Sequence, residues 1–160
     1  MLSESPLATH DLSAKVEYAI LALIELAGVW NQKKPITVSE IATRQPIPDR
    51  YLEHIFTMLR RGGLVQSQRG AKGGYILIRE PWKVTVSDVI NLVDGEAHNG
   101  TSNRQKGKET VASISCEREI VRDIWQEAAL ASQEVLSRYT IQDLCEQRDR
   151  QKQKHPMYYI

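Results

Sequence analysis

Hydrophobic residues recur at steps of three and four along several stretches of the chain, and this spacing predicts amphipathic helices. The first helix begins after Ser13, whose hydroxyl can cap it, and ends near Gly28. A capping box formed by Thr37 and Glu40 predicts a second, short helix over 38–44. The chain is therefore expected to open with two helices joined by a polar loop.

A third helix and a β-hairpin are predicted next. The prolines of the segment QPIPD end the second helix, and Asp49 can cap the third. That helix ends where two arginines are followed by two glycines, at 60–63. Alternating residues then predict strands over 64–69 and 75–80, separated by the glycine-containing turn GAKGG. Two strands around a turn of this length are typical of a hairpin.

The fourth predicted helix is VSDVINLVDG, which Thr85 or Ser87 can cap and which Gly95 is expected to end. Residues 96–112 contain almost no large apolar groups, so a loop or a disordered insert is expected there. This insert separates the hairpin and the helices before it from the C-terminal part of the chain.

A long amphipathic helix is predicted from near Ser115 to about Ser137. Thr140 can cap a shorter helix, TIQDLCEQ, and the charged tail RDRQKQKHPMYYI after it is expected to be loose. One apolar stripe follows the long helix and consists of Ile120, Ile124, Ala128, Ala131 and Val135.

The order helix, helix, helix, hairpin is that of a winged helix-turn-helix. The predicted fold class is therefore mainly α with a small β-hairpin wing, followed by a long C-terminal helix. In such a domain the third helix enters the major groove of DNA, and the hairpin lies on the neighbouring backbone.

Composition is compatible with one globular domain and an extension, since 41% of the 160 residues are apolar and 26% are charged. No apolar run is long enough to span a bilayer, and residues 1–11 lack the features of a signal peptide. The expected compartment is the cytoplasm, with no membrane partner. The two cysteines, Cys116 and Cys145, are therefore expected to be reduced thiols.

The net charge of +1 conceals a basic segment. Between Arg44 and Lys83 the chain has eight basic and three acidic residues, which gives a local charge of +5. A basic face of this kind suits a polyanion such as DNA. A solvated surface is the alternative explanation of the charge alone.

Residue types on the predicted third helix match the recognition of bases and phosphates. Arg50 can bind guanine or phosphate, and Glu53 can accept a hydrogen bond from cytosine N4. Tyr51 and His54 can reach phosphates or base edges. Each residue alone also fits an ordinary helix surface, but their position between a capped helix and a basic hairpin favours DNA.

The glycine-rich stretch RGAKGGYILI invites comparison with phosphate-binding loops. The dinucleotide and Walker motifs both fail, because the glycines lie at 70, 73 and 74 and a strand follows instead of a helix. The stretch is therefore predicted to bring Arg69 and Lys72 to a nucleic-acid backbone. The four histidines lie in no hydrolase or zinc-protease motif, so the chain is predicted not to be an enzyme.

Three segments resemble the Rrf2 family of bacterial winged-helix transcriptional regulators, which includes iron–sulfur, nitric-oxide and cysteine regulators. They are LSAKVEYAILALIELA, VSEIATRQPIPDRYLEHIFTMLRRGGLVQSQRGAKGGYILIRE and VTVSDVINLVDG. The resemblance spans about 12–95 and resumes from the long helix to Cys145. It implies a homodimer that crosses its long C-terminal helices, through the apolar stripe, and binds double-stranded DNA at a palindromic operator.

The resemblance also implies which residues contact DNA, on the third helix and on the wing. Together with the reading of the residue types, it gives one predicted set. That set consists of Thr37, Ser39, Arg50, Tyr51, Glu53, His54 and Arg60 on the helices, and of Arg69, Gly70, Lys72 and Tyr75 on the wing.

Cluster-binding members of the family often carry three cysteines between the fourth helix and the long helix, whereas this chain has only Cys116, at the position of the third. The resemblance places Glu17 where some members supply a carboxylate, and His98 can offer an imidazole. The predicted cofactor is an iron–sulfur cluster of the [2Fe–2S] type held by these residues. Two alternatives stay open: a direct redox switch at Cys116, and a cluster-free regulator controlled by a protein partner or a metabolite.

The predicted function is a dimeric, sequence-specific DNA-binding transcriptional regulator that senses iron–sulfur or redox status near Cys116. A protein that uses the winged fold for protein contacts only is the competing class. The expected regions are an N-terminal extension (1–11), a winged helix-turn-helix domain (12–95), a flexible sensor insert (96–114), a dimerisation helix region (115–145) and a C-terminal tail (146–160).

Overall fold

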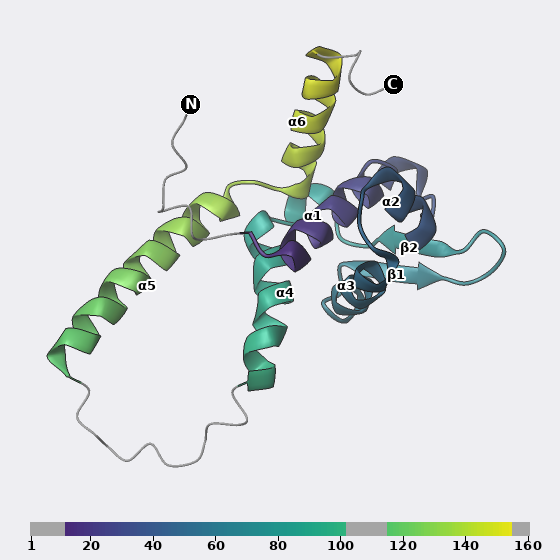
Figure 1. Cartoon of the computed structure of the whole chain (residues 1–160). Coiled ribbons are helices and arrows are strands. Elements are labelled where there is room, and N and C mark those ends of the chain that lie inside the picture. Colours follow the sequence, from purple (N-terminus) through teal and green to yellow (C-terminus); the bar gives the residue numbers. More distant parts are fainter. Residues whose placement is uncertain (1–11, 102–114, 155–160) are drawn as a thin grey trace.

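The computed structural model describes residues 12–101 and 115–154, with 96–101 described as backbone only. The described part is mainly helical and contains one two-stranded antiparallel sheet, as the sequence predicted (Figure 1). Its elements, in chain order, are α1 (Ala14–Ala27), η1 (Trp30–Gln32), α2 (Val38–Arg44), α3 (Asp49–Arg61), β1 (Val65–Gln68), β2 (Gly74–Leu77), η2 (Pro81–Lys83), α4 (Val86–Thr101), α5 (Cys116–Ser137) and α6 (Ile141–Lys154).

Side-chain caps fix the beginnings of α1 and α2 where they were predicted. The Val16 amide donates to the Ser13 hydroxyl over 3.3 Å. In the capping box of α2, the Glu40 amide donates to the Thr37 hydroxyl over 3.1 Å, and the Thr37 amide donates to the Glu40 carboxylate over 2.8 Å. These bonds satisfy amide groups that have no partner inside the helix.

The prediction of Asp49 as the cap of α3 is wrong. Pro48 occupies the cap position with an extended backbone, and its carbonyl accepts from the Tyr51 amide over 3.0 Å. Asp49 is the first residue of the helix itself, where the positive end of the helix dipole favours a carboxylate. Proline fits this position because no helical hydrogen bond there requires the N–H that it lacks.

The wing is a β-hairpin whose strands are shorter than predicted, with four residues each. Val65 pairs with Leu77 and Gln68 with Gly74. The hairpin is also tied to the segment before α2, because Tyr75 and Ile36 exchange both backbone hydrogen bonds at 2.8 and 3.0 Å. This bridge fixes the wing relative to α2 and α3.

Two helices continue past their predicted ends. Gly95 does not stop α4, which reaches Thr101; a glycine costs only about 1 kcal/mol inside a helix when it does not adopt the left-handed cap conformation. α6 runs on to Lys154, through residues that were expected to be loose. An Arg150–Glu146 ion pair of 3.3 Å one turn apart and lysines in the last turn support this extension.

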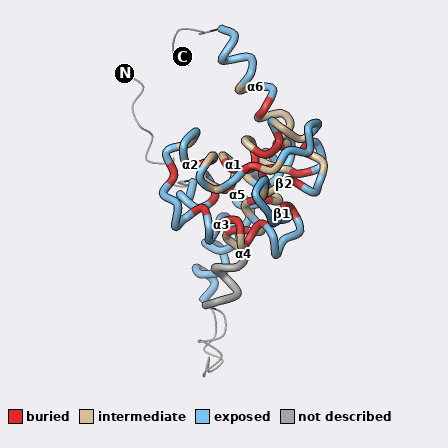
Figure 2. Tube along the Cα trace, turned by 90° about the vertical axis from the view of Figure 1, so that its right-hand side faces the viewer, coloured by how far each residue is buried: buried red, intermediate tan, exposed pale blue. Residues whose placement is uncertain are grey.

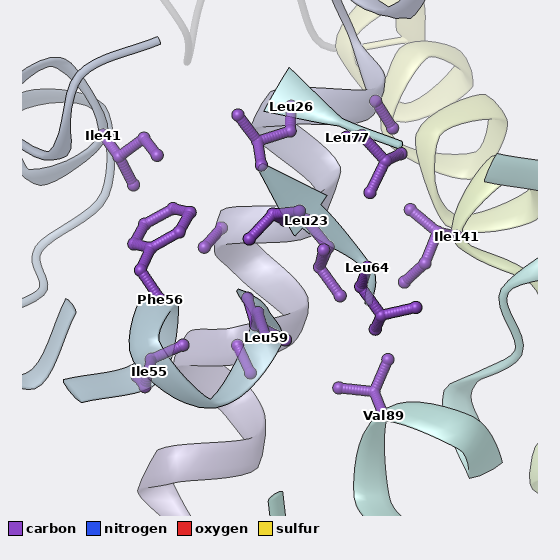
Figure 3. Close-up of a cluster of buried hydrophobic side chains, with 14 of the residues drawn as sticks. Leu23, Leu26, Ile41, Ile55, Phe56, Leu59, Leu64, Leu77, Val89 and Ile141 are labelled. Atoms are coloured by element: carbon purple, nitrogen blue, oxygen red, sulfur yellow. The ribbon is translucent and has the colours of Figure 1, made fainter. Parts of the chain in front are cut away.

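The core lies where α1, α3, the wing, α4 and the start of α6 meet. Figure 3 shows Leu23, Phe56, Leu64 and Ile141 pointing into the same interior, and all are at most 1% exposed. The Phe56 ring stacks on Tyr75 of the wing, with ring centroids 4.2 Å apart. Figure 2 shows the same concentration of buried residues in the body of the molecule.

Two helices extend out of this body. α5 projects on the side opposite the hairpin and contains no buried residue (Figure 1). α6 is anchored by Ile141 and Cys145 at its base, while its outer half is largely exposed (Figure 2). Among the described residues, no helix is long and apolar enough to cross a membrane.

Candidate nucleic-acid interface

The helix-turn-helix is formed by α2 and α3, and buried apolar residues of both helices and of their connection hold it on the core. Ile41 of α2 and Ile47 of the connection are buried. The buried face of α3 consists of Leu52, Ile55, Phe56, Met58 and Leu59. Because these positions follow the helical repeat, the residues between them must face outward.

The outward face of α3 carries Arg50, Glu53, His54 and Arg60, and all four are exposed. Their spacing of three, four and six to seven residues places them along one side of the helix. Arg50 lies in the first turn and Arg60 in the last. The predicted groove-reading side chains are therefore brought together on one accessible surface.

Tyr51 is positioned by its neighbours on both sides of its ring. The ring lies 6.0 Å from that of Tyr18 of α1 in an edge arrangement, and the Arg50 guanidinium lies 5.0 Å from its centroid. Tyr51 is 38% exposed. Its ring thus links α3 to α1 and supports the Arg50 side chain.

The tip of the wing exposes Arg69 and Lys72. Gly70 has a φ of +117°, and the Gly73 amide donates to the Gly70 carbonyl over 2.9 Å. A side chain at Gly73 would lie 2.5 Å from the Gln68 carbonyl oxygen. The glycines therefore allow the chain to reverse tightly, with both basic side chains at the tip.

Two predicted DNA contacts, Thr37 and Tyr75, have structural partners of their own. Thr37 and Ser39 are exposed at the start of α2, but the Thr37 hydroxyl also forms the cap of that helix. Tyr75 is half-buried, and its ring lies on Phe56 rather than on the wing surface. The backbone amide and the hydroxyl of Thr37 also donate to the Glu40 carboxylate, over 2.8 and 3.1 Å, and these two bonds lower the pKa of Glu40, the amide more than the hydroxyl.

A groove of about 570 Å³ separates the start of α2 from the wing tip. Lys34 and Thr37 line one side, and Lys72 and Gly73 line the other. Lys34 was not among the predicted contacts. Its place three residues before Thr37 of the capping box is the signal that could have indicated it.

The basic segment divides into paired and unpaired residues. Arg44 binds Glu25 of α1 at 3.2 Å, and Lys83 binds Glu80 at 2.6 Å. The basic side chains on the outward face of α3 and on the wing tip belong to no ion pair within the described residues. The basic residues concerned are Arg50, Arg60, Arg61, Arg69 and Lys72. Among the described residues, none of these side chains therefore has a carboxylate oxygen within 4.0 Å, although Glu53 lies on the same face of α3.

The predicted cluster ligands do not form a metal site in the described part of one chain. Cys116 is exposed in the first turn of α5, and Glu17 is exposed in the first turn of α1. The side chain of His98 lies outside the described residues. No group of three His, Cys, Asp or Glu side chains is placed there to hold a metal ion. A single thiol cannot hold an iron–sulfur cluster alone, since such a cluster takes four ligands.

Cys145 is separate from these residues. It is buried at the base of α6, and its thiol lies 3.7 Å from the Ile24 carbonyl oxygen. Burial raises the pKa of this thiol. Cys145 therefore acts as a small apolar residue of the core.

The apolar stripe of α5 is exposed in the single chain. Ile120, Ile124 and Val135 are between 48% and 57% exposed. Trp125, beside the stripe, is 70% exposed. Ala128 and Ala131 are also exposed. Large apolar side chains at this density on one helix are typical of a surface that another protein covers.

Comparison with known proteins agrees with this arrangement. The model of the Rrf2 family, described as an iron-dependent transcriptional regulator, matches residues 12–147. An rrf2-like HTH-type transcriptional regulator of Rhodobacter capsulatus is 43% identical over 86 residues, which are 52% of this chain and 57% of the relative. The HTH-type transcriptional regulator CymR of Bacillus subtilis is 32% identical over 93% of this chain and 99% of its own length.

Solved structures of the same kind have the same fold. The IscR of T. potens is 31% identical, with a TM-score of 0.68 over 85% of this chain and 86% of that protein. Both IscR and CymR are thus similar to this chain over most of its length. The family match covers the helix-turn-helix, the wing, α4 and α5. The chain therefore belongs to the Rrf2 family of winged-helix transcriptional regulators.

Proposed function

We propose that this protein is a sequence-specific DNA-binding regulator that acts as a homodimer. The observation that carries the proposal is the set of unpaired basic side chains on the outward face of α3 and on the wing tip. Such charges bind phosphates and release counterions from DNA. α3 is also the helix that a helix-turn-helix protein inserts into the major groove.

The proposed role of each side chain, in phosphate or in base contact, follows from its chemistry. Arg50 and Arg60, near the two ends of α3, reach phosphates or guanine, while Glu53 and His54 on the same face read base edges. Arg69 and Lys72 at the wing tip hold the neighbouring backbone. Thr37 lines the groove beside the wing tip, and Ser39 is exposed in the first turn of α2; both are proposed to reach phosphates there. Gly70 lets the tip approach closely, and Tyr75 supports the wing from inside.

The second copy of the chain is proposed to cover α5. The stripe from Ile120 to Val135 is apolar and exposed, and a two-fold dimer buries such a stripe against itself. A dimer also explains the expectation of a palindromic operator, because the two copies of α3 would read equivalent half-sites.

Salt-dependent binding to duplex DNA tests the interface. The logarithm of the association constant should fall steeply with the logarithm of salt concentration, and Arg69→Ala or Lys72→Ala should each reduce that slope by about one. Lys152→Ala, an exposed lysine of α6 away from the interface, is the control. Wing variants that bind duplex DNA as the parent does at every salt concentration would remove the wing from the interface.

Base reading is tested separately at Glu53. Glu53→Ala should relax the preference for one operator over its single-base variants more than it weakens total binding. The parent operator first has to be selected from random duplexes. A variant that loses total affinity but keeps the full preference would place Glu53 outside the base-reading set.

The signal is proposed to act through Cys116. Its exposure in the first turn of α5, at the edge of the proposed dimer helix, favours a thiol that reacts directly with an oxidant. The family description, an iron-dependent regulator, favours a cluster whose remaining ligands, Glu17 and His98 among them, would come from more than one segment or copy. Control by a protein partner or a metabolite is the third possibility.

Anaerobic purification separates these signals. A coloured protein with iron and sulfide, which Cys116→Ala abolishes, supports the cluster. A colourless protein that loses DNA affinity on mild oxidation, with Cys116→Ala insensitive and Cys145→Ala still sensitive, supports the thiol switch. A colourless protein whose DNA binding ignores oxidation contradicts both and leaves a partner or metabolite as the signal.

A further inference from the structure

A small cavity of about 250 Å³ lies between the end of α1, the turn η1 and the wing. Its lining is mostly apolar. Leu26 and Leu77, both buried, contribute from the core side, while Val29, Trp30, Ile76 and Ile78 enclose it from η1 and β2. Leu26 and Leu77 belong to the main core, so the cavity borders that core.

The outer face of β2 is unusually apolar where it meets this cavity. Residues alternate between the two faces of a strand, so Tyr75 and Leu77 face the core while Ile76 and Ile78 face outward. A two-stranded sheet normally carries polar residues on its outer face, as β1 does with Gln66 and Gln68. Ile78 is nevertheless 44% exposed.

The polar side chains that line the cavity are two lysines and one glutamine. Lys33, Lys34 and Gln68 line it, and no carboxylate does. Neither lysine belongs to an ion pair among the described residues. Two positive charges at the side of an apolar hollow are complementary to an amphipathic anion.

The backbone holds Lys33 in a costly conformation at this place. Its φ is +48° and its ψ +31°, and it is the one non-glycine residue with positive φ in the described part of the chain. Asparagine, aspartate and glycine adopt this conformation more readily than lysine. A strained backbone position is a reason to look for function at that residue.

We propose that the cavity binds a small amphipathic anion, with an apolar body against Trp30, Ile76 and Ile78 and a carboxylate near Lys33 and Lys34. The volume equals that of about eight liquid water molecules, which suits a body of about eight to twelve non-hydrogen atoms. Apolar pockets with a few convergent polar groups are the usual form of small-molecule sites.

Occupancy would also affect the wing, because Gln68, Ile76 and Ile78 belong to the hairpin or follow it directly. A ligand that fills the cavity favours the wing position in which these side chains enclose it. This consequence rests on the proposed DNA-binding function; the binding site itself does not.

Octanoate, below its micelle concentration, is the probe, and 1-octanol and octylamine are the neutral and cationic controls. Calorimetry without DNA should give one saturable octanoate site per chain, with 1-octanol at least about tenfold weaker and octylamine weaker still. The indole NMR signal of Trp30 should shift with the same saturation curve. Binding assays on duplex DNA with and without octanoate then measure the coupling to the wing.

The matched variants are Lys33→Asn and Lys34→Gln. Asparagine keeps the left-handed backbone of residue 33 and removes its charge, so the fold is retained. Together, the two substitutions should lower the affinity for octanoate about tenfold or more and leave the affinity for 1-octanol unchanged. Lys152→Gln should change neither affinity.

Three results would overturn the site: no saturable binding, equal affinity for octanoate and 1-octanol, or full octanoate affinity in the lysine variants. A Trp30 signal that instead changes with protein concentration would assign the cavity to a contact between copies. If the protein fails to bind DNA but octanoate binds as described, the proposed function fails and the site stands. If the protein binds DNA but not octanoate, the site fails and the proposed function stands.

Discussion

Close backbone contacts at single residues determine the shape of the wing. Gly74 has a φ of +147°, and a side chain there would lie 2.7 Å from the Ile36 carbonyl carbon and oxygen. Gly70, at the other end of the turn, has a φ of +117° but open space around it. Gly70 is therefore required only for its backbone conformation. Gly74 is required both for its conformation and for the room that a missing side chain leaves.

Gly74→Ala should therefore destabilise the protein more than Gly70→Ala. The backbone conformation alone costs about 1–3 kcal/mol in each variant. Gly74→Ala also pushes the wing away from Ile36, since the contact is with backbone that cannot rotate aside. Urea unfolding monitored by circular dichroism gives the two free energies of unfolding. Equal losses in both variants would show that the Ile36 contact yields without cost.

The capping box of α2 gives one carboxyl group a distinct pH dependence. The hydrogen bonds from Thr37 lower the pKa of Glu40 below its ordinary value of 4.5. A lowered pKa means that the ionised carboxylate stabilises the fold at neutral pH, and that this contribution is lost as the pH falls below 4.5 towards the lowered value.

The difference in free energy of unfolding between the parent and Glu40→Gln should therefore become smaller in acid. The difference is expected to be constant between about pH 6 and 8 and to shrink below pH 4.5. Thr37→Ala should return the pKa of Glu40 towards its ordinary value, as measured by NMR titration of the carboxyl carbon. A stability difference that stays constant down to pH 3 would contradict the role of the carboxylate.

At the scale of elements, α5 differs from every other long helix in the described structure. α1 and α3 bury one face in the core, whereas α5 buries none of its residues. Its apolar stripe nevertheless recurs at three- and four-residue steps, so a covering surface is expected that the single chain does not provide. The same reasoning underlies the proposed dimer.

Ile124→Glu should disrupt association without unfolding the single chain. Ile124 is 57% exposed, so the charge meets water in the monomer and an apolar surface in the dimer. The dimer should weaken by at least about tenfold, measured by analytical ultracentrifugation. Gln133→Glu, on the opposite side of α5, is the control. If Ile124→Glu dimerises like the parent, the stripe does not form the interface.

At the scale of the whole molecule, one core joins segments from both ends of the described chain. Ile141 of α6 is fully buried, and its amide donates to the Val84 carbonyl over 2.9 Å. Figure 3 places Ile141 near Leu64, directly before β1, and near Leu77, the last residue of β2. α6 is therefore part of the winged domain at its base, although it follows α5 in sequence.

Ile141→Ala should consequently destabilise the whole domain rather than loosen α6 alone. The expected loss is about 2–5 kcal/mol in the free energy of unfolding, with fluorescence and circular dichroism reporting one common transition. Lys152→Ala, on the exposed outer half of α6, should stay within about 0.5 kcal/mol of the parent. An early, separate melting of α6 in the isoleucine variant would show that its base is not integrated in the core.

Much of the fold was predictable because it depends on neighbouring residues. The caps at Ser13, Thr37 and Thr140 and the apolar periodicity of α1 and α5 are local signals, and the structure confirms them. The candidate interface was predictable as a set of exposed residues on one helix and one turn. Which of these side chains contact DNA stays a prediction.

Other features depended on distant partners and could not be read locally. The Thr85–Asp88 bonds fix only the start of α4, and nothing near Gly95 reveals that the helix continues. The stacking of Tyr75 on Phe56 and the pairing of Arg44 with Glu25 join residues at least 19 positions apart. Because of these contacts, Tyr75 and Arg44 have structural roles that the sequence did not reveal.

The sequence by itself determined the fold class, the family and the order of helices and hairpin, because helical periodicity, capping and turn residues act over a few positions. Only the tertiary structure decided which basic residues remain unpaired, that α6 closes the core of the winged domain, and that a lysine-lined cavity lies behind the wing. Those properties arise where segments distant in the chain meet, and their distances are set by packing rather than by spacing along the sequence.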